Sequence, residues 1–312
     1  GTINCVSAFT LTKAKELIYN NPPWKSGAGF LFQEKRFMNS LPGSAPHFSL
    51  IIPAYNEEAY LPVLLDSVAA ARARYAGGAD DIEVVVVDNA STDATADLAR
   101  SSGCRVVRED RRIIAAVRNT GARYARGHVF VFVDADNIMH PDTFNAIDKR
   151  LSTGKVIAGA SGVNMQRMSL GIAVTYALMV PLVWLTRMDT GVVFCRRDDF
   201  ETIGGYNEDL LFAEDVQLLW DLMRLGWKQG RKLSRIRSVK ATFSTRKFDK
   251  HGDWHWLGLL LRFSYGLVFS KSSMNNFARK YWYGNQRSKT NESIAECNFL
   301  ISHGPTRTHT DD

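Results

Sequence analysis

The chain has 312 residues, of which 45% are hydrophobic and 23% are charged, and its net charge is +7. These are the proportions of an ordinary globular protein, and no long Lys/Arg run, helix-turn-helix or RNA-binding signature is present, which excludes nucleic acid as the expected partner. The four cysteines are far apart and form no C-x-x-C pair, which argues against a zinc site. With no recognisable signal peptide, they predict reduced thiols in a cytoplasmic protein.

The first 46 residues show little periodicity and contain two clusters of helix-breaking residues, so we expect an N-terminal extension over residues 1–46. We predict strands over residues 48–53, 82–88, 104–107 and 129–133, and helices over residues 60–75, 113–126 and 216–225. A further helix should end at Arg100 and be capped by Ser91 or Thr92. This alternation predicts the α/β class, with a mostly parallel central sheet flanked by helices.

The run Val129–Val133 is a continuous apolar strand that leads directly into Asp134 and Asp136. Because side chains alternate along a strand, the two carboxylates should point to the same side. Two carboxylates at the end of a buried strand are costly unless a cation lies between them, and Mg²⁺ or Mn²⁺ suits carboxylate oxygens. A strand followed by an ordinary acidic turn is the alternative interpretation.

Three polar clusters lie where the predicted strands end: Tyr55 to Glu57, then Asp88 and Asn89, then the pair Asp134 and Asp136. Ligands of parallel sheets bind outside the carboxyl ends of the strands, so these clusters predict a binding site. No Gly-rich turn follows the first strand. The dinucleotide fingerprint and the P-loop are therefore both missing, which disfavours hydride transfer and P-loop nucleotide hydrolysis.

Several segments together resemble the motifs of glycosyltransferase family 2, in the order in which that family has them. The matching segments are Ile51–Glu57, Val86–Asp93, Arg118–Gly121, Asp134–Asp136, Gly204–Tyr206 and Glu214–Asp215. The resemblance covers about residues 48–250. It implies the GT-A fold, a nucleotide-diphosphate sugar as donor, and an inverting glycosyl transfer assisted by a divalent metal, as in cell-wall or polysaccharide biosynthesis.

The resemblance also assigns roles around the donor nucleotide. Pro53, Tyr55, Glu57, Asp88 and Asn89 would surround its base and ribose. The family often has a second Asp at the last of these positions. An amide donates as well as accepts hydrogen bonds, so the identity of the base stays open.

Cationic residues are expected near the phosphates of the donor. Arg112 and Arg118 would face the donor, with a solvated helix face as the alternative, and Arg246 and Lys247 would steady the pyrophosphate.

Three residues are the expected metal ligands. By resemblance, Asp136, with Asp134 nearby, would hold the metal that neutralises the leaving group. His251 would complete the metal ligands as a neutral imidazole, although a structural or exposed His is the alternative.

The pair Glu214 and Asp215 precedes the predicted helix over residues 216–225. An inverting transfer needs a base that removes the proton of the acceptor hydroxyl, and by resemblance Asp215 takes this role with Glu214 beside it. Acids that interact with the dipole of a helix N-terminus are the alternative.

Two apolar stretches, residues 168–186 and 254–270, raise the question of a membrane. A spanning helix at the first stretch would separate Asp136 from Asp215, and Pro181 would interrupt it, so we expect a packed or interfacial helix followed by a turn and strand over residues 189–197. The acceptor, a saccharide, a lipid or a polyprenyl phosphate, stays open. The sequence also leaves open whether the two stretches pack in the core or contact the inner face of the membrane peripherally. It leaves open whether the protein forms a homodimer.

The domain organisation follows from these segments. We predict a GT-A domain over residues 47–250, with a nucleotide-binding half over 47–140 and an acceptor half over 141–250. A C-terminal helical segment over residues 251–290 and a disordered tail over residues 291–312 should follow.

Other functions fit the sequence less well. A nucleotidyltransferase would carry a basic Gly-rich loop after the first strand, and the segment Pro53–Glu57 is neither basic nor Gly-rich. A non-catalytic nucleotide-sugar or lipid-binding module would not need both acidic pairs. A processive synthase would carry a Q-x-x-R-W motif, whereas Gln217 is followed by Leu218-Leu219-Trp220.

Overall fold

The structure is a computed structural model that describes residues 45–186, 189, 191–210 and 213–254. The chain divides into two units, Gly1–Ala45 and Pro46–Asp312, and the following description concerns the second. The predicted N-terminal extension, nearly all of the second apolar stretch, most of the C-terminal helical segment and the tail lie outside the described residues.

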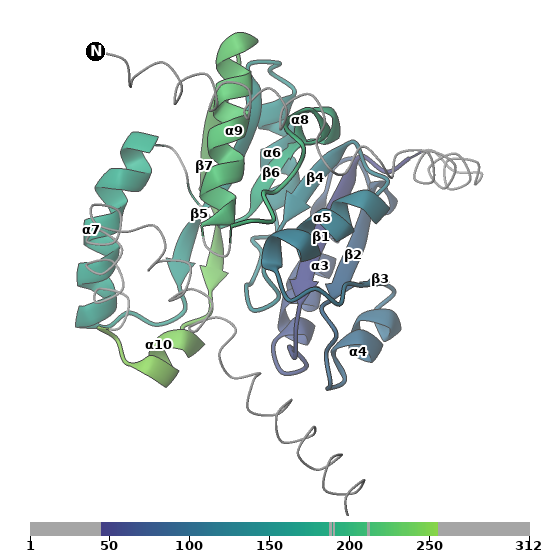
Figure 1. The fold of residues 1–312 in the computed structure, drawn as a ribbon, viewed down its shortest axis with the longest axis vertical. Coiled ribbons are helices and arrows are strands. Elements are labelled where there is room, and N and C mark those ends of the chain that lie inside the picture. The colour runs from purple at the N-terminus through teal and green to yellow at the C-terminus, as the bar shows by residue number, and fades with distance from the viewer. Residues whose placement is uncertain (1–44, 187–188, 190, 211–212, 255–312) are drawn as a thin grey trace, which may run out of the picture. The chain divides into compact units, whose positions relative to one another are not determined.

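A seven-stranded sheet forms the centre of the described unit, in the order β3-β2-β1-β4-β6-β5-β7 (Figure 1). The strands are β1 (Phe48–Ala54), β2 (Ile82–Asp88), β3 (Arg105–Arg108), β4 (Val129–Phe132), β5 (Val156–Met165), β6 (Val193–Arg196) and β7 (Lys232–Phe243). Only β6 runs antiparallel to its neighbours, β4 and β5. The mostly parallel sheet predicted from the sequence is therefore confirmed, and the carboxyl ends of β1, β2, β4 and β7 lie at one edge.

Helices connect and flank these strands. They are α3 (Leu61–Arg74), the short 3-10 helix η2 (Ala79–Asp81), α4 (Thr95–Ser101), α5 (Ile114–Tyr124), α6 (Thr143–Leu151), α7 (Leu170–Thr186), α8 (Arg197–Ile203), α9 (Glu214–Lys228) and α10 (Arg246–His251). The predicted strands β1 to β4, the helices α3, α5 and α9, and the turn and strand that form β6 are confirmed to within a few residues. Strands β5 and β7 were not predicted.

The predicted start of α4 is wrong. The helix begins at Thr95, and neither Ser91 nor Thr92 caps it. The hydroxyl of Ser91 instead accepts a hydrogen bond from the backbone of Asn56, and Asp93 accepts the backbone N–H of Thr95. The polar residues after β2 therefore bind the loop after β1, which joins the two loops at the sheet edge.

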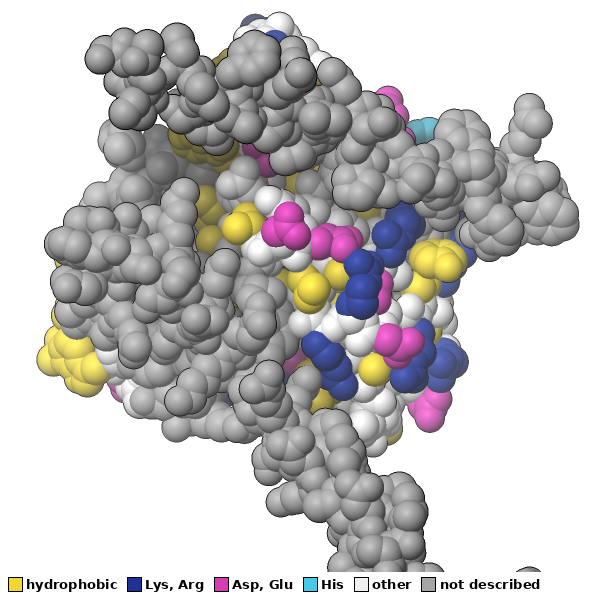
Figure 2. Space-filling view, in the orientation of Figure 1, with side chains coloured by type: hydrophobic (Ala, Val, Ile, Leu, Met, Phe, Trp, Pro, Cys, Tyr) yellow, Lys and Arg dark blue, Asp and Glu magenta, His cyan; other side chains and the backbone are white. Residues whose placement is uncertain are grey.

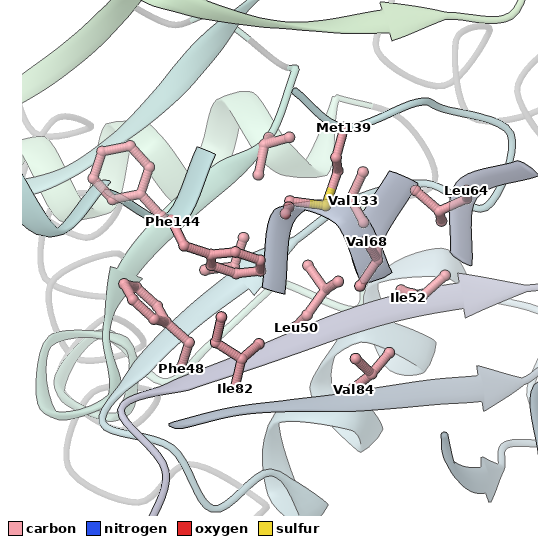
Figure 3. Close-up of a cluster of buried hydrophobic side chains, with 14 of the residues drawn as sticks. Phe48, Leu50, Ile52, Leu64, Val68, Ile82, Val84, Val133, Met139 and Phe144 are labelled. Carbon is pink, nitrogen blue, oxygen red and sulfur yellow. The ribbon is translucent and has the colours of Figure 1, made fainter. Parts of the chain in front are cut away.

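The sheet is buried on both faces because successive strand residues enter different hydrophobic clusters. Leu50 and Ile52 pack in one cluster with α3 and α6, and Figure 3 shows this side of the sheet. Ile51 packs in the other cluster with α5, α8 and α9. All three side chains are fully or almost fully buried, as expected for a strand covered by helices on both faces.

One glycine explains how closely α5 approaches the sheet. A Cβ atom at Gly121 would lie 2.3 Å from Cγ2 of Ile51 and 2.9 Å from Cγ2 of Val87, closer than van der Waals contact allows. The residue at this position of α5 must therefore be glycine for the helix to sit on β1 and β2. This contact sets the position of the preceding turn of α5, which carries Arg118.

The first apolar stretch forms α7, and Pro181 does not interrupt it, contrary to the prediction. Among the described residues, no helix is long and apolar enough to cross a membrane. Leu170 and Leu178 are exposed on α7, to 74% and 57%. Of the cysteines, Cys104 and Cys195 lie in the described part of the chain, and both are free.

Candidate active site

The polar residues that end β1, β2 and β4 lie at one edge of the sheet, together with the residues after β7 and the first turn of α9. Left-handed backbone conformations concentrate in the same loops. Asn56 follows β1 with φ 51°, Ala90 follows β2 with φ 55°, and Ala213 precedes α9 with φ 58°. Such conformations are costly for residues with a Cβ atom and often occur where a site requires a particular loop path.

Arg118 on α5 is the centre of the site. Its guanidinium lies 2.8 Å from Oδ1 of Asp134, 2.7 Å from Oε1 of Glu214 and 2.8 Å from Oδ1 of Asp215. Only 4% of Arg118 is exposed, so the alternative of a solvated helix face is wrong for this residue. Burial lowers the pKa of Arg118, but the three carboxylates and Tyr206 together raise it by more than burial lowers it. The net pKa is above the usual value, and the group stays charged.

Asp215 is held from two sides through the same oxygen. The hydroxyl of Tyr206 donates to its Oδ1 at 2.9 Å, and Arg118 contacts that atom as well. Burial raises the pKa of Asp215 to about 6, a rise that Arg118 opposes and that Glu214 and Asp134 increase. The Tyr206 hydrogen bond lowers this pKa. Asp215 is therefore a carboxylate that changes protonation close to neutral pH.

Tyr206 has a fixed position of its own. Asn119, the residue after Arg118, accepts the backbone N–H of Tyr206 and donates to its carbonyl oxygen, each at 2.9 Å. The ring packs edge-on against Phe132 with centroids 5.2 Å apart. The preceding Gly205 has φ 78°, and a Cβ there would lie 2.7 Å from Oδ1 of Asn119. The segment before α9 is thereby joined to α5.

A second arginine, Arg246 at the start of α10, binds the other acidic residues of the sheet edge. Its Nη1 and Nη2 donate to the two carboxylate oxygens of Glu57 at 2.7 and 2.5 Å. Its Nε lies 3.0 Å from Oδ2 of Asp136, and its guanidinium lies over the ring of Tyr60, 4.6 Å from the centroid. The predicted phosphate-binding cation therefore contacts the predicted metal ligand.

The end of β2 contains the other predicted donor residues. Asp88 is 5% exposed and accepts the backbone N–H of Ser91. The amide of Asn89 donates to the carbonyl oxygens of Glu109 and Arg111, at 2.6 and 2.9 Å. Asn89 therefore holds the loop between β3 and α5, a task that an Asp carboxylate could not perform because it has no donor.

The loop held by Asn89 leads to Arg112. The guanidinium of Arg112 lies 3.7 Å from the ring centroid of Tyr55. Its Nη2 donates to the carbonyl oxygen of Ala90, whereas its Nη1 is buried without a hydrogen-bond partner in the described structure. These two residues form a stacked pair beside Asp88.

Three predicted site residues contribute no polar side-chain contacts in the described part of the chain. Pro53 is buried inside β1, where it pairs with Val87 of β2. Lys247 and His251 lie in α10, but their side chains are outside the described structure, so the prediction of His251 as a metal ligand stays untested.

The carboxylates Asp134 and Asp136 suit a hard divalent cation in their chemistry. The side chain of Asp134 is 40% exposed and that of Asp136 is 11% exposed. Among the described side chains, no group of three His, Cys, Asp or Glu residues could hold a metal ion. Mg²⁺ is commonly bound by one or two carboxylates together with substrate phosphates, and this donor set fits that arrangement.

The sequence pattern did not reveal the roles of Tyr206 and Asn119, although both lie in segments that carried the family resemblance. It also did not predict the contacts of Arg118 with three carboxylates, and its prediction that Arg118 faces the donor phosphates stays a prediction. One signal was available, because Ala115, Arg118 and Ala122 lie three and four residues apart, on the buried face of α5. No local pattern points to the hydroxyl of Tyr206.

The charges at the surface are largely balanced. In Figure 2, the Lys and Arg side chains on the described part of the visible face lie beside Asp and Glu side chains. Arg111, for example, pairs with Glu109 and Glu208. The net positive charge therefore forms no single-sign surface on this part of the molecule.

Comparisons with known proteins agree with the resemblance. A sequence model described as Glycosyl transferase family 2 matches residues 49–176. The Putative glycosyltransferase EpsH of Bacillus subtilis (strain 168) is 31% identical over 102 residues, which are 31% of this chain and 28% of the relative. Validoxylamine A glucosyltransferase of Streptomyces hygroscopicus subsp. limoneus is 35% identical over 116 residues, which are 34% of this chain and 25% of the relative. The chain thus spans about a quarter of the length of these relatives.

A solved structure shares the fold. The mannosyltransferase PcManGT from Pyrobaculum calidifontis, in complex with GDP-Man and Mn²⁺, superimposes with a TM-score of 0.51 and 24% identity, over 70% of this chain and 64% of that chain. The predicted GT-A fold, with a mostly parallel sheet flanked by helices, is confirmed. The family match over residues 49–176 includes β1, β2, β4 and their polar ends, and over this segment the chain is similar to glycosyltransferase family 2.

Proposed function

We propose that this protein is an inverting glycosyltransferase that moves a sugar from a nucleotide-diphosphate sugar to a hydroxyl acceptor, assisted by a divalent metal. The observation that carries the proposal is the contact of one guanidinium, that of Arg118, with both Asp134 and Asp215. An inverting transfer needs a leaving-group site and a base on opposite sides of one carbon atom. The two carboxylates come from the end of β4 and the start of α9, and the guanidinium of Arg118 contacts both of them.

Asp215 is the proposed base. With a pKa of about 6, it is mainly ionised at pH 7 and basic enough to accept a proton as the acceptor oxygen attacks. Since Tyr206 and Arg118 both contact Oδ1, we assign Oδ2 to receive the proton. The acceptor oxygen bonds to the anomeric carbon as the bond to the diphosphate breaks, and the configuration at that carbon inverts.

The leaving nucleoside diphosphate requires positive charge at the opposite side. A divalent metal bound by Asp136 and Asp134, when present, supplies part of that charge. Arg246 supplies a guanidinium from α10 at the same sheet edge, 3.0 Å from Asp136. The stacked pair Tyr55 and Arg112, beside the buried Asp88, is the proposed binding site for the base and ribose.

The acceptor side is proposed to include the region of α7. Leu170, Leu178, Met168 and Trp254 are each more than half exposed, which favours an apolar or lipid-linked acceptor and contact with a membrane surface. Flotation with anionic liposomes at low salt should recover the protein with the vesicles. Protein that stays at the bottom of the gradient would contradict membrane contact without affecting the proposed reaction.

The first experiment on the function is a thermal-shift screen with UDP, GDP, CDP and TDP sugars, with and without Mn²⁺. Binding to the native state raises the midpoint, and one nucleotide should do so selectively, with a smaller shift in Asp136→Ala. The selected donor is then incubated with the protein, and the sugar released to water is followed by ¹H NMR. Inversion predicts that the first anomer to form is opposite to that of the donor.

Three outcomes would contradict the proposal. Release of the same anomer would indicate a retaining reaction. Pyrophosphate formed from a nucleoside triphosphate and a sugar phosphate, with no sugar released from any donor, would favour the nucleotidyltransferase alternative. No binding of any nucleotide sugar would favour a non-catalytic module with another ligand.

A further inference from the structure

Arg246 presents a conflict that the proposed function does not explain. It contacts Asp136, which would bind the metal, although a guanidinium and a metal ion are both cations. The guanidinium of Arg246 is fixed by several contacts at once. Its two terminal nitrogens donate to both carboxylate oxygens of Glu57, while its Nε faces Asp136. Such bidentate pairs are among the stronger ion pairs in proteins.

The environment explains why a cation is required there. The side chains of Glu57 and Asp136 are both only 11% exposed, and that of Arg246 is 29% exposed. Two carboxylates brought this close in a poorly solvated place repel each other unless a positive charge lies between them. Arg246 supplies one positive charge to two negative ones, which leaves the three-residue cluster with a net charge of about −1.

A metal ion that binds Asp136 would face the charge of Arg246 at close range. Without another anion, the metal must either bear that repulsion or displace the guanidinium from its partner. A nucleoside diphosphate removes the conflict, because its phosphate oxygens offer Arg246 a new anionic partner. Metal and diphosphate would then each make the binding of the other more favourable, and this coupling is reciprocal.

Resting on the proposed function, we propose that Arg246 makes metal binding depend on the nucleoside diphosphate: its guanidinium neutralises Asp136 in the free protein and moves to the diphosphate when donor and metal bind. Arg246 thus determines the order in which the ligands of this site are taken up. Metal alone binds weakly, and the diphosphate recruits it.

The contacts of α10 allow such a move without displacement of the helix. Arg167, before α7, pairs with Asp249 and Asp253 at 2.7 and 2.6 Å, which fastens α10 on its other side. The bidentate contact with Glu57 keeps the guanidinium at the sheet edge. Only the contact between Nε and Asp136 has to be exchanged for a phosphate oxygen.

Binding of Mn²⁺, measured by the loss of the free-ion EPR signal, tests this exchange without any turnover. In the wild type, Mn²⁺ alone should bind weakly. In Arg246→Met, Mn²⁺ alone should bind about tenfold more tightly, while UDP or GDP in the absence of metal should bind about tenfold more weakly by calorimetry. Arg246→Lys, which keeps the charge, should bind Mn²⁺ alone as weakly as the wild type.

Two control variants separate the possible causes. Arg100→Met removes the same charge from an exposed ion pair on α4 and should leave Mn²⁺ affinity unchanged. Asp136→Asn should abolish Mn²⁺ binding, with or without nucleotide. If Asp136→Asn binds Mn²⁺ with the same affinity as the wild type, the proposed metal site is wrong. The metal assistance in the proposed function is then contradicted.

The inference on Arg246 fails by a different result. If Asp136→Asn loses the metal, but Arg246→Met binds Mn²⁺ alone no more tightly than the wild type, then Arg246 is only a structural ion pair. The same conclusion follows if Arg246→Lys strengthens metal binding as much as Arg246→Met, because loss of side-chain packing rather than of charge would then be the cause.

Discussion

Two arginines organise the two halves of this site, and they differ in how they are buried. Arg118 lies on α5, is 4% exposed, and contacts three carboxylates from β4 and α9. Arg246 lies at the start of α10, has a side chain that is 29% exposed, and contacts two carboxylates that follow β1 and β4. The same chemical group is therefore used in a sealed and in a more open environment.

The difference indicates two separate tasks. A buried guanidinium with several carboxylate partners is costly to displace, so Arg118 is suited to hold the proposed base Asp215 in one place. A partly exposed guanidinium can exchange one of its partners for a ligand, so Arg246 is suited to respond to the donor. The following predictions test this division between a fixed and an exchangeable arginine.

The largest effect is expected from Arg118→Met. This change leaves Asp134, Glu214 and Asp215 near one another without their shared cation. Removing one partner from a buried ion pair typically costs about 3 to 5 kcal/mol, and we expect a loss of that size in the free energy of unfolding, measured with urea. A loss below about 1 kcal/mol would show that the cluster relaxes into solvent.

Asp215→Asn should lower the rate of sugar release from the donor by at least about 100-fold, which is the usual contribution of a general base. The amide keeps the size of the side chain but cannot accept the proton. Nucleotide binding, followed by thermal shift, should be unchanged. The neighbouring Glu214→Gln serves as the matched control, and a larger loss there than in Asp215→Asn would assign the base to Glu214.

Arg246→Met should cost less stability than Arg118→Met, about 1 to 2 kcal/mol in the free energy of unfolding, since its partners can regain water. Arg100→Met, from an exposed pair, should cost less than about 0.5 kcal/mol. If Arg246→Met costs as much as Arg118→Met, the two arginines are equally fixed, and the division between them is wrong.

The smallest effect is expected from Tyr206→Phe, in the pH dependence of sugar release. The base must be ionised, so the wild-type rate should rise with pH through about 6, the pKa of Asp215. The Tyr206 hydrogen bond lowers that pKa, and its loss should move the midpoint upward by about half to one pH unit.

A second tyrosine provides the control for that shift. The hydroxyl of Tyr176 on α7 contacts the carbonyl oxygen of Val163, away from Asp215, so Tyr176→Phe should leave the profile unchanged. A midpoint that does not move in Tyr206→Phe, or that moves to lower pH, would mean that the hydroxyl does not act on the ionised carboxylate.

Much of the fold was predictable because local pattern and burial agree there. Strands β1, β2 and β4 are covered on both faces, so their sequences are continuous apolar runs. Strand β5 was not recognised because Gly159, Ser161 and Gly162 interrupt its apolar residues. Strand β7 is at the edge of the sheet and alternates buried residues with Lys and Arg, a weaker pattern than a buried run.

The site, like the fold, contains features that the local sequence predicts and features that it does not. The acidic residues after β4 and at the start of α9 are visible in the sequence, because residue type and the position after a strand or before a helix are local properties. Arg118 was recognised as a site residue, but its carboxylate partners were not predicted. Its contacts with Asp134 and Glu214 join residues 16 and 96 positions apart, and no local period encodes such a pairing.

The sequence by itself determined the type of sheet, the edge at which the polar residues collect, and the acids available there. Only the tertiary structure decided which arginine faces which acid, and how far each is removed from water. The pKa of Asp215 is the clearest case, because burial by distant segments raises it, whereas Arg118 and Tyr206, from α5 and the segment before α9, lower it. The free energy of an ion depends on all the charges and the solvent around it, and these are defined only when the chain has folded.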